Sequence, residues 1–227
     1  AGYQAVLHAG ACYIETDVQV TADHVPILSH DPDLARLTGH DYRVTEAEYP
    51  LIRELPAGYP ERFGESFDKL RIARLDEFAV LLKQWPQARA FIEIKQDSTR
   101  THGTARVVGI ILNTLVDVLP QCILISFEHE VLVTSRKLGN LPIGWVIPEW
   151  SEDSRGLARH LNPEYLFCSR KRLPPETGVL WQGDWRWVVY TVNEVDEVLA
   201  FGKRGIDMVE TNRISQLLVD PKLNPGS

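Results

Sequence analysis

Short apolar runs alternate with amphipathic stretches along most of the chain, and this alternation predicts its secondary structure. Runs rich in Val, Ile and Leu, which are typical of strands, begin near residues 12, 89, 122, 142, 164, 186 and 206. Apolar residues at helical spacing predict helices over 1–9, 76–85, 103–119, 128–138, 153–160, 175–182, 194–203 and 214–219. Strands separated by amphipathic helices predict a parallel sheet with helices outside it.

The number of strands favours a barrel over an open sheet. The chain opens on the helix expected at 1–9, which stops at Gly10 as a helix with a glycine cap does. Seven parallel strands are one fewer than a closed eight-stranded barrel needs. We therefore expect an α/β fold of the (β/α)8 TIM-barrel class, in a single domain over residues 1–227, that lacks its first strand in this sequence. An open doubly wound sheet is the alternative, although its glycine-rich phosphate turn is not found.

One long segment departs from the alternation. After the extended run VPILS at 25–29, the chain from about 31 to 75 is rich in Pro, Gly, Tyr and charged residues and has no clear periodicity. Long connections of this kind usually lie on the surface and carry function. We expect a loop insertion beside a strand end rather than a separate domain.

Two of the strand-like runs, IETDVQV and FIEIK, carry charged residues two positions apart. Because side chains alternate between the faces of a strand, Glu15 and Asp17 share one face, and so do Glu93 and Lys95. Burying these charges costs several kcal/mol each unless they meet one another, a metal or a charged ligand. In parallel barrels, reactive groups gather at the carboxyl ends of the strands. The pattern predicts one charged site there, whereas a solvent-facing edge strand would need no such repeat.

The types of residue in this pattern indicate its chemistry. Glu15, Asp17 and Glu93 offer hard oxygen ligands, which suit Mg²⁺ or Ca²⁺ and suit zinc poorly without His or Cys. His30 follows the extended run at 25–29, and an unperturbed histidine titrates near neutrality. Alone it would be read as a turn residue, and only its place after the acidic strand makes it a catalytic candidate.

The composition of the chain excludes some classes of binding partner. The formal net charge of -7 and the lack of a dense Lys and Arg patch argue against nucleic acid. No stretch reaches the roughly 18 to 20 apolar residues of a membrane span. Cys12, Cys122 and Cys168 lie in apolar runs without CxxC spacing, which indicates reduced core thiols and makes the cytoplasm the default compartment. The sequence does not determine the oligomeric state.

Five segments carry a resemblance to a known family. They are IETDVQVTADHVPILSHDPDL (14–34), FIEIK (91–95), ILISFEHEVL (123–132), VVYTVNE (188–194) and GIDMVETNRI (205–214). The first is the most specific, since an acid pair, a turn and His-Asp occur together at fixed spacing. The chain resembles the glycerophosphodiester phosphodiesterases, whose barrels hydrolyse glycerophosphodiesters to glycerol 3-phosphate and an alcohol.

The resemblance implies a role for each charged residue of the pattern. Glu15, Asp17 and Glu93 would bind a divalent metal, His30 would be one of two catalytic histidines, and Lys95 would contact the phosphate. One histidine would remove a proton from the attacking glycerol hydroxyl, which forms a cyclic phosphate, and the other would protonate the departing alcohol. Which of the two steps His30 serves is open.

Two aromatic residues at strand ends are candidates for the wall of the substrate pocket. These are Phe127 and Tyr190, and Tyr190 stands where the family usually has a tryptophan. Glu210-Thr211-Asn212 replaces a usual Thr-Asp pair. The strand ending in His-Arg-Gly with which family members open is not found in this sequence.

Two other functions stay open. One is a catalytically inactive barrel that retains ligand binding, which a missing strand would enforce. The other is a barrel glycosidase with paired carboxylates, which would need no metal and would leave Lys95 without a role.

Overall fold

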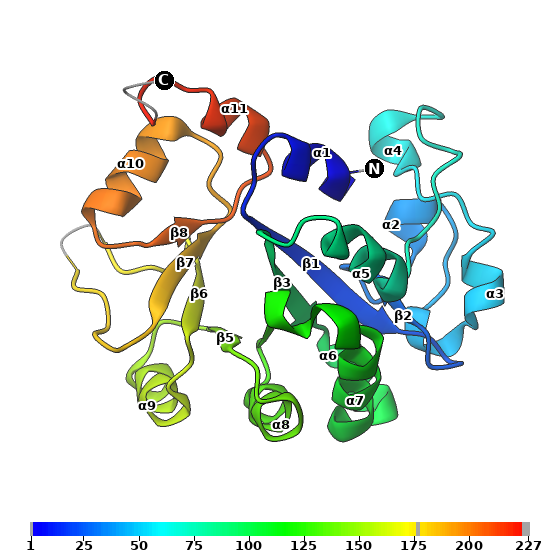
Figure 1. The fold of residues 1–227 in the computed structure, drawn as a ribbon, viewed down its shortest axis with the longest axis horizontal. Helices are drawn as coiled ribbons and strands as arrows, with labels where there is room; N and C mark the ends of the chain where they lie inside the picture. Colours follow the sequence, from blue (N-terminus) through cyan, green and yellow to red (C-terminus); the bar gives the residue numbers. More distant parts are fainter. Residues whose placement is uncertain (1, 176–177, 224–227) are drawn as a thin grey trace.

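Eight strands of the computed structural model form one curled sheet in the order β2-β1-β3-β4-β5-β6-β7-β8 (Figure 1). The structure describes residues 2–175 and 178–223. The strands are β1 (Tyr13–Val20), β2 (Pro26–Leu28), β3 (Arg89–Ile94), β4 (Cys122–Ser126), β5 (Ile143–Val146), β6 (Tyr165–Ser169), β7 (Arg186–Tyr190) and β8 (Met208–Val209). Among the strands of the described residues, only β2 is antiparallel to its neighbour, so the seven predicted parallel strands are confirmed.

The sheet curls without closing on itself. Among the described strands, β8 pairs with β7 and β1 pairs with β2 and β3, so β1 and β8 do not pair with each other. A barrel with one strand fewer than closure requires was expected, and the opening lies between β8 and the first part of β1, since β2 pairs only with residues 18–20 of β1. Figure 1 shows the two strands on either side of the gap, with the first and last helices above it.

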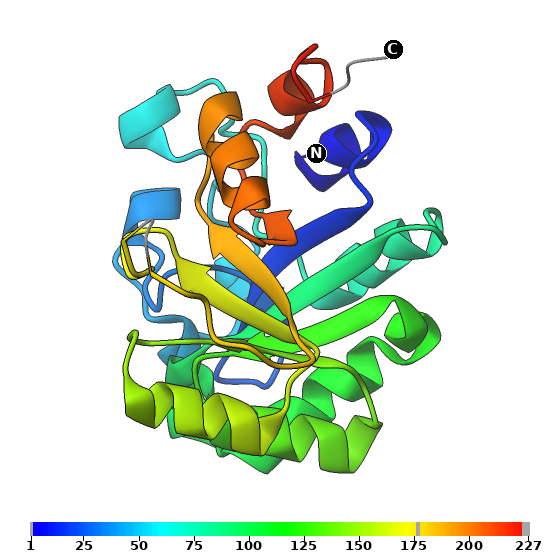
Figure 2. The same ribbon diagram turned by 90° about the vertical axis from the view of Figure 1, so that its left-hand side faces the viewer.

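Helices cover the outer face of the sheet. The longer ones are α1 (Gly2–His8), α5 (Leu75–Lys83), α6 (Gln96–His102), α7 (Thr104–Thr114), α8 (His129–Gly139), α9 (Glu152–Leu161), α10 (Val195–Lys203) and α11 (Ile214–Leu218). In both ribbon views α7, α8 and α9 lie at one end of the molecule and α1 and α11 at the other (Figures 1 and 2). The helix expected over 103–119 ends at Thr114 and continues as a 3-10 turn, η2 (Val116–Gln121), which contains Pro120.

One predicted helix is wrong, and another was not predicted. Residues 178–182 of the expected helix 175–182 are not helical, and 176–177 lie outside the described residues. Conversely, α6 has no apolar periodicity. It forms because Ser98 and Thr99 are buried, with Ser98 Oγ accepting from the Val20 amide at 2.8 Å and Thr99 Oγ1 donating to Glu128 Oε2 at 2.5 Å.

The core lies in layers on the two faces of the sheet. On the outer face, strand residues such as Ile92 and Leu124 pack with helix residues such as Ile111. The inner face has a cluster made of strand residues alone, among them Phe91 and Phe167. A Cβ on Gly144 would lie 2.8 Å from Ile125 Cγ2 and 3.0 Å from Phe167 Cε2, so this position needs glycine for the inner layer to pack.

The insertion between β2 and α5 packs on the sheet through a small hydrophobic cluster of its own. Its buried members are Ile27, Leu34, Val44, Ala47, Ile52, Leu55 and Ile72. Its short helices are α2 (Ala35–Thr38), η1 (Val44–Glu46), α3 (Tyr49–Ile52) and α4 (Pro60–Phe63). Because Ile27 belongs to β2, the insertion is fastened to the edge of the sheet beside β1, on the right in Figure 1.

The cysteine prediction is confirmed for two residues and wrong for the third. Cys122 and Cys168 are buried free thiols, and burial raises the pKa of each to about 12. Cys12 is exposed, because it precedes β1 at the open edge of the sheet. None of the helices in the described ranges combines the length and the hydropathy needed to cross a bilayer.

Candidate functional site

The structure brings the three predicted acidic residues together on one face of β1 and β3. Glu93 lies one residue before the end of β3, whereas Glu15 and Asp17 lie in the first half and the middle of β1 and not at its carboxyl end as expected. Asp17 and Glu93 are directly paired in the register of the two strands, and Glu15 lies one inward-facing position earlier, opposite Phe91. One carboxylate oxygen from each of the three acids lies within 4.8 Å of the others. The period of two in both strands therefore collects the acids on the inner face, as the pattern predicted.

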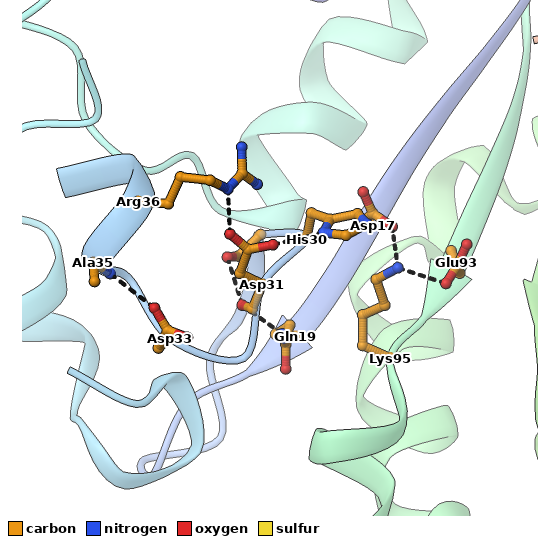
Figure 3. A network of polar contacts seen from close by, with 10 residues as sticks. Asp17, Gln19, His30, Asp31, Asp33, Ala35, Arg36, Glu93 and Lys95 are labelled. Carbon is orange, nitrogen blue, oxygen red and sulfur yellow. Dashed lines mark hydrogen bonds and ion pairs between the residues drawn. The ribbon is translucent and has the colours of Figure 1, made fainter. Parts of the chain in front are cut away.

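Lys95 lies between two of these acids. Its Nζ is 2.6 Å from Asp17 Oδ1 and 2.6 Å from Glu93 Oε1 (Figure 3). The Lys95 amide donates to the Val18 carbonyl at 3.2 Å, so the β1–β3 ladder extends to this residue and holds it in place. Burial alone would lower the pKa of Lys95, but the charges and hydrogen bonds of the two acids outweigh burial and raise it. The ammonium therefore stays charged and neutralises part of the cluster.

Glu15 lacks such a partner. Its Oε1 is buried and has no hydrogen-bond partner in the described part of the chain. Burial, followed by repulsion from Asp17, Glu210 and Glu93, raises the pKa of Glu15 well above its usual value, and Lys95 offsets only part of this. A buried carboxylate oxygen without a donor is energetically costly, so this atom indicates a missing cationic or hydrogen-bonding ligand.

A fourth acid, Glu210, joins the cluster, although it was not among the predicted site residues. Glu210 directly follows β8, and its amide donates to the Val189 carbonyl at 2.9 Å. Burial, then repulsion from Asp17 and Glu93, raises the pKa of Glu210 to about 7. The sequence could have indicated Glu210, because it is a charged residue at the end of the last apolar strand, and Glu93 was selected by its place at the end of a strand.

The charge balance of the cluster fits a divalent cation. Among the described residues four carboxylates lie around a single ammonium. Burial, and after it repulsion between the acids, raises the pKa values of Glu15, Glu93 and Glu210, and Lys95 offsets only part of this rise. The donors are all oxygens, which suits Mg²⁺ or Ca²⁺ and not zinc. The buried, unpartnered Glu15 Oε1 is the observation that supports a metal ligand there.

His30 and Phe127 lie beside the cluster. Together with Glu93 and Lys95 they line a cavity of about 210 Å³ at the ends of β3 and β4. His30 Nδ1 is 2.7 Å from Asp31 Oδ1, and its side chain is 66% exposed. Phe127 is 40% exposed, so its ring is available to a ligand.

Tyr190 is placed differently from Phe127. It ends β7 and packs against the inner hydrophobic cluster. It is not among the described residues that line the cavity of about 210 Å³ or a second, larger cavity of about 580 Å³. Burial raises its pKa to about 12, and the charges of Glu93 and Glu210 contribute to this rise. Tyr190 therefore lies near the acids, and its predicted place in the wall of the substrate pocket stays a prediction.

A larger cavity of about 580 Å³ reaches the acids from the gap between β1 and β8. Glu15 and Glu210 line it, together with the aromatic rings of Tyr13, Phe91 and Phe167. Glu15 and Glu210, which have no ion-pair partner among the described residues, thus face the open side of the barrel, whereas Asp17 and Glu93 face Lys95.

Glu210 gives a stability prediction. A carboxyl group whose pKa is raised on folding, here from 4.5 to about 7, binds its proton more tightly in the folded state. Its stabilising contribution is therefore present at low pH and is lost as the pH rises through about 7. In metal-free protein we expect Glu210→Gln to match the wild type near pH 4, below the ordinary pKa of 4.5, and to have the higher free energy of unfolding near pH 8, as measured by denaturant titration.

The matched control is Glu130→Gln, which changes an exposed acid on α8. Its free energy of unfolding should follow that of the wild type at both pH values. Parallel pH curves for Glu210→Gln and the wild type would contradict the prediction.

Comparison with known proteins adds to this geometry. The model of the glycerophosphoryl diester phosphodiesterase family matches residues 1–216. No curated protein matches the sequence.

Several solved structures are similar in fold. A putative glycerophosphoryl diester phosphodiesterase from Silicibacter pomeroyi has a TM-score of 0.81 at 23% identity, covering 97% of this chain and 88% of that one. An Oleispira antarctica phosphodiesterase, solved with the product sn-glycerol-3-phosphate, has a TM-score of 0.79 at 18% identity, and the match covers 92% of this chain and 85% of that one. A Parabacteroides distasonis glycerophosphodiester phosphodiesterase has a TM-score of 0.76 at 17% identity, and the match covers 95% of this chain and 87% of that one.

These similarities confirm the barrel fold class, since the chain superimposes on those structures over more than nine-tenths of its length. The family model also spans the strands that carry Glu15, Asp17, Glu93 and Glu210. The chain therefore belongs to the glycerophosphoryl diester phosphodiesterase family, a family of phosphoric diester hydrolases.

Proposed function

We propose that this protein hydrolyses glycerophosphodiesters to glycerol 3-phosphate and an alcohol, with a divalent metal and histidine acid/base catalysis. The observation that carries the proposal is the convergence of Glu15, Asp17 and Glu93 on one point beside His30 and Lys95. The similar Oleispira antarctica enzyme was solved with sn-glycerol-3-phosphate as its product, which supports this class of substrate.

The three acids would hold the metal, and Mg²⁺ and Ca²⁺ are the candidates. When bound, such a cation draws off negative charge from the phosphate oxygens. Asp17 and Glu93 are already held in position by the strand register and by Lys95, and Glu15 Oε1 is free to bind. The protein thus provides a preformed set of oxygen ligands.

Lys95 would contact the phosphate. It lines the same cavity as His30, and its ammonium stays charged because of its acidic neighbours. A fixed positive charge in a half-buried site stabilises the charge that develops on the phosphorus oxygens in the transition state. A glycosidase that uses paired carboxylates would have no such role for Lys95.

His30 would transfer one proton. It either removes the proton of the glycerol hydroxyl as that oxygen attacks phosphorus, or gives a proton to the departing alcohol. Its exposed ring can reach a substrate in the cavity of about 210 Å³, and Phe127 would border the same substrate. We place Tyr190 beneath the substrate, where its ring supports the floor of the pocket.

The cysteines support a compartment for this activity. Cys12, Cys122 and Cys168 are all free, and free thiols persist in reducing surroundings. We propose the cytoplasm.

Metal removal tests the function. The intact protein is incubated with glycerophosphodiesters, and glycerol 3-phosphate is measured through its dehydrogenase. Treatment with a chelator should reduce the rate by at least about 100-fold, since the cation supplies several kcal/mol of transition-state stabilisation. Adding back Mg²⁺ or Ca²⁺ should restore it.

Two outcomes would count against the proposal. An intact protein that binds glycerol 3-phosphate but turns over no glycerophosphodiester with either metal would indicate a binding protein. Turnover of glycosides in the presence of the chelator would indicate the paired-carboxylate glycosidase.

A further inference from the structure

His30 is an exposed side chain whose direction depends on one contact. Its ring is 66% exposed, and the side-chain contact that holds it within the described part of the chain joins Nδ1 to Asp31 Oδ1 at 2.7 Å (Figure 3). An exposed histidine without such a contact samples several rotamers, so its reactive nitrogen would face the substrate for only part of the time. Whatever fixes Asp31 therefore also fixes His30.

The two carboxylate oxygens of Asp31 are divided between two partners. Oδ1 faces His30, and Oδ2 accepts from Arg36 Nε at 2.5 Å (Figure 3). The hydrogen bond from Arg36 is the main reason that the pKa of Asp31 lies below its usual value. An ionised carboxylate can only accept hydrogen bonds, so His30 Nδ1 must donate. In the neutral ring the proton then lies on Nδ1, and the lone pair of Nε2 is left for the substrate.

Arg36 is itself held firmly by the insertion. It lies in α2, which ends at Gly39 with a positive φ of 78° and is tied by a hydrogen bond from Thr38 Oγ1 to the Leu34 carbonyl at 2.8 Å. The Arg36 guanidinium lies over the ring of Tyr59 at 5.1 Å, which adds a cation–π contact. The insertion therefore supplies a donor that is oriented toward Asp31 by its contact with Tyr59.

The backbone of Asp31 is fixed without its side chain. Gln19 Nε2 donates to the Asp31 carbonyl at 2.7 Å, and Ser29 Oγ donates to the same oxygen at 3.1 Å. Changing the Asp31 carboxylate should therefore leave this turn in place. The Asp31 side chain is not needed for this turn, and its carboxylate links Arg36 to His30.

We propose that Arg36 is a positioning residue for His30, acting through Asp31 to hold the ring and to keep its proton on Nδ1. The proposal rests on the proposed function in taking His30 as the catalytic histidine that removes the proton of the attacking hydroxyl, since only that step needs the lone pair of Nε2. It assigns to the insertion a part in catalysis, since Arg36 and Tyr59 both belong to it.

Asp31→Asn is the most informative variant. Arg36 still requires an acceptor, so the asparagine should turn its oxygen to Arg36 and its NH2 group to His30. Nδ1 must then accept, and the neutral ring must carry its proton on Nε2, which removes the lone pair needed by the substrate. We expect ring ¹⁵N correlation spectra to show this change of tautomer, and kcat to fall by about 100-fold with KM little changed. Comparison with His30→Gln identifies the ring signals.

The double variant Asp31→Asn with Arg36→Ala tests the link between the two residues. Without Arg36 the asparagine can turn its oxygen to His30, and the proton can return to Nδ1. Arg36→Ala alone should lower kcat by about 10-fold, with partial rescue in Arg36→Lys. The double variant should be more active than Asp31→Asn, because removing Arg36 releases the asparagine.

The control is Arg53→Ala, an exposed arginine of the same insertion that pairs with exposed Glu54 and should change neither kcat nor the spectrum. The inference is overturned if the wild-type ring carries its proton on Nε2, if Asp31→Asn leaves the tautomer unchanged, or if the two defects simply multiply in the double variant. The spectra decide this even if the wild type hydrolyses no glycerophosphodiester, and that last result would count against the proposed function instead.

Discussion

Replacing Glu15 by glutamine should abolish the response of this protein to divalent cations and lower kcat/KM for glycerophosphodiesters by about 10³-fold. Glu15 Oε1 is the buried oxygen that lacks a partner in the described residues, and Glu15 is the one acid of the predicted metal triad that does not pair with Lys95. The substitution therefore removes a metal ligand and leaves the two ion pairs of Lys95 intact. Loss of about 4 kcal/mol of charge stabilisation corresponds to that factor.

The same substitution should stabilise the metal-free protein. The buried Glu15 carboxyl is repelled by Asp17, Glu210 and Glu93, and a neutral amide of the same size removes that repulsion. Thermal unfolding at pH 8 in chelator should show a higher midpoint for Glu15→Gln than for the wild type, and adding Ca²⁺ or Mg²⁺ should raise only the midpoint of the wild type. Glu130→Gln is the matched exposed control. Retention of a metal-induced shift by Glu15→Gln would remove Glu15 from the ligand set.

Replacing His30 by glutamine should lower kcat by 10²- to 10⁴-fold, the usual contribution of a general acid or base. Because the ring is 66% exposed and lies outside the acidic triad, the midpoint of thermal unfolding and the affinity for the metal should not change. Steady-state kinetics and a metal titration of the same preparation check both statements. A defect that appears in KM alone would assign His30 to substrate binding instead of proton transfer.

His40→Gln is the control for this variant. His40 is an exposed histidine in the same insertion, at a distance from the acids along the chain, and its replacement should leave the kinetics unchanged. A similar loss in both variants would show that the insertion as a whole, and not the His30 ring, supports activity.

Local patterns were enough to predict the strands and the acidic face. The period of two puts Glu15 and Asp17 on one face of β1, and puts Glu93 on the same face of β3 as Phe91, because alternation is a property of the extended backbone. Buried Val, Ile and Leu runs likewise mark strands covered on both sides. For this reason the seven parallel strands could be counted from the sequence.

Contacts between distant segments could not be read in this way. Helix α6 has no apolar periodicity, and it depends on Ser98 bonding to Val20 and on Thr99 bonding to Glu128. Residues 178–182 were expected to be helical from local preference but are not, since Trp181 is buried against Trp150 and Trp187 and packing takes precedence over propensity.

The sequence by itself determined the fold class, the shared face of Glu15 and Asp17 and the candidacy of His30, because these follow from periodicity and spacing along the chain. Only the tertiary structure decided that Glu210 joins the acids, that Lys95 pairs with two of them, and that Arg36 reaches Asp31. Each of these depends on the curl of the sheet or the path of the insertion. Electrostatic energies depend on the distances that this folding creates, and no local pattern contains them.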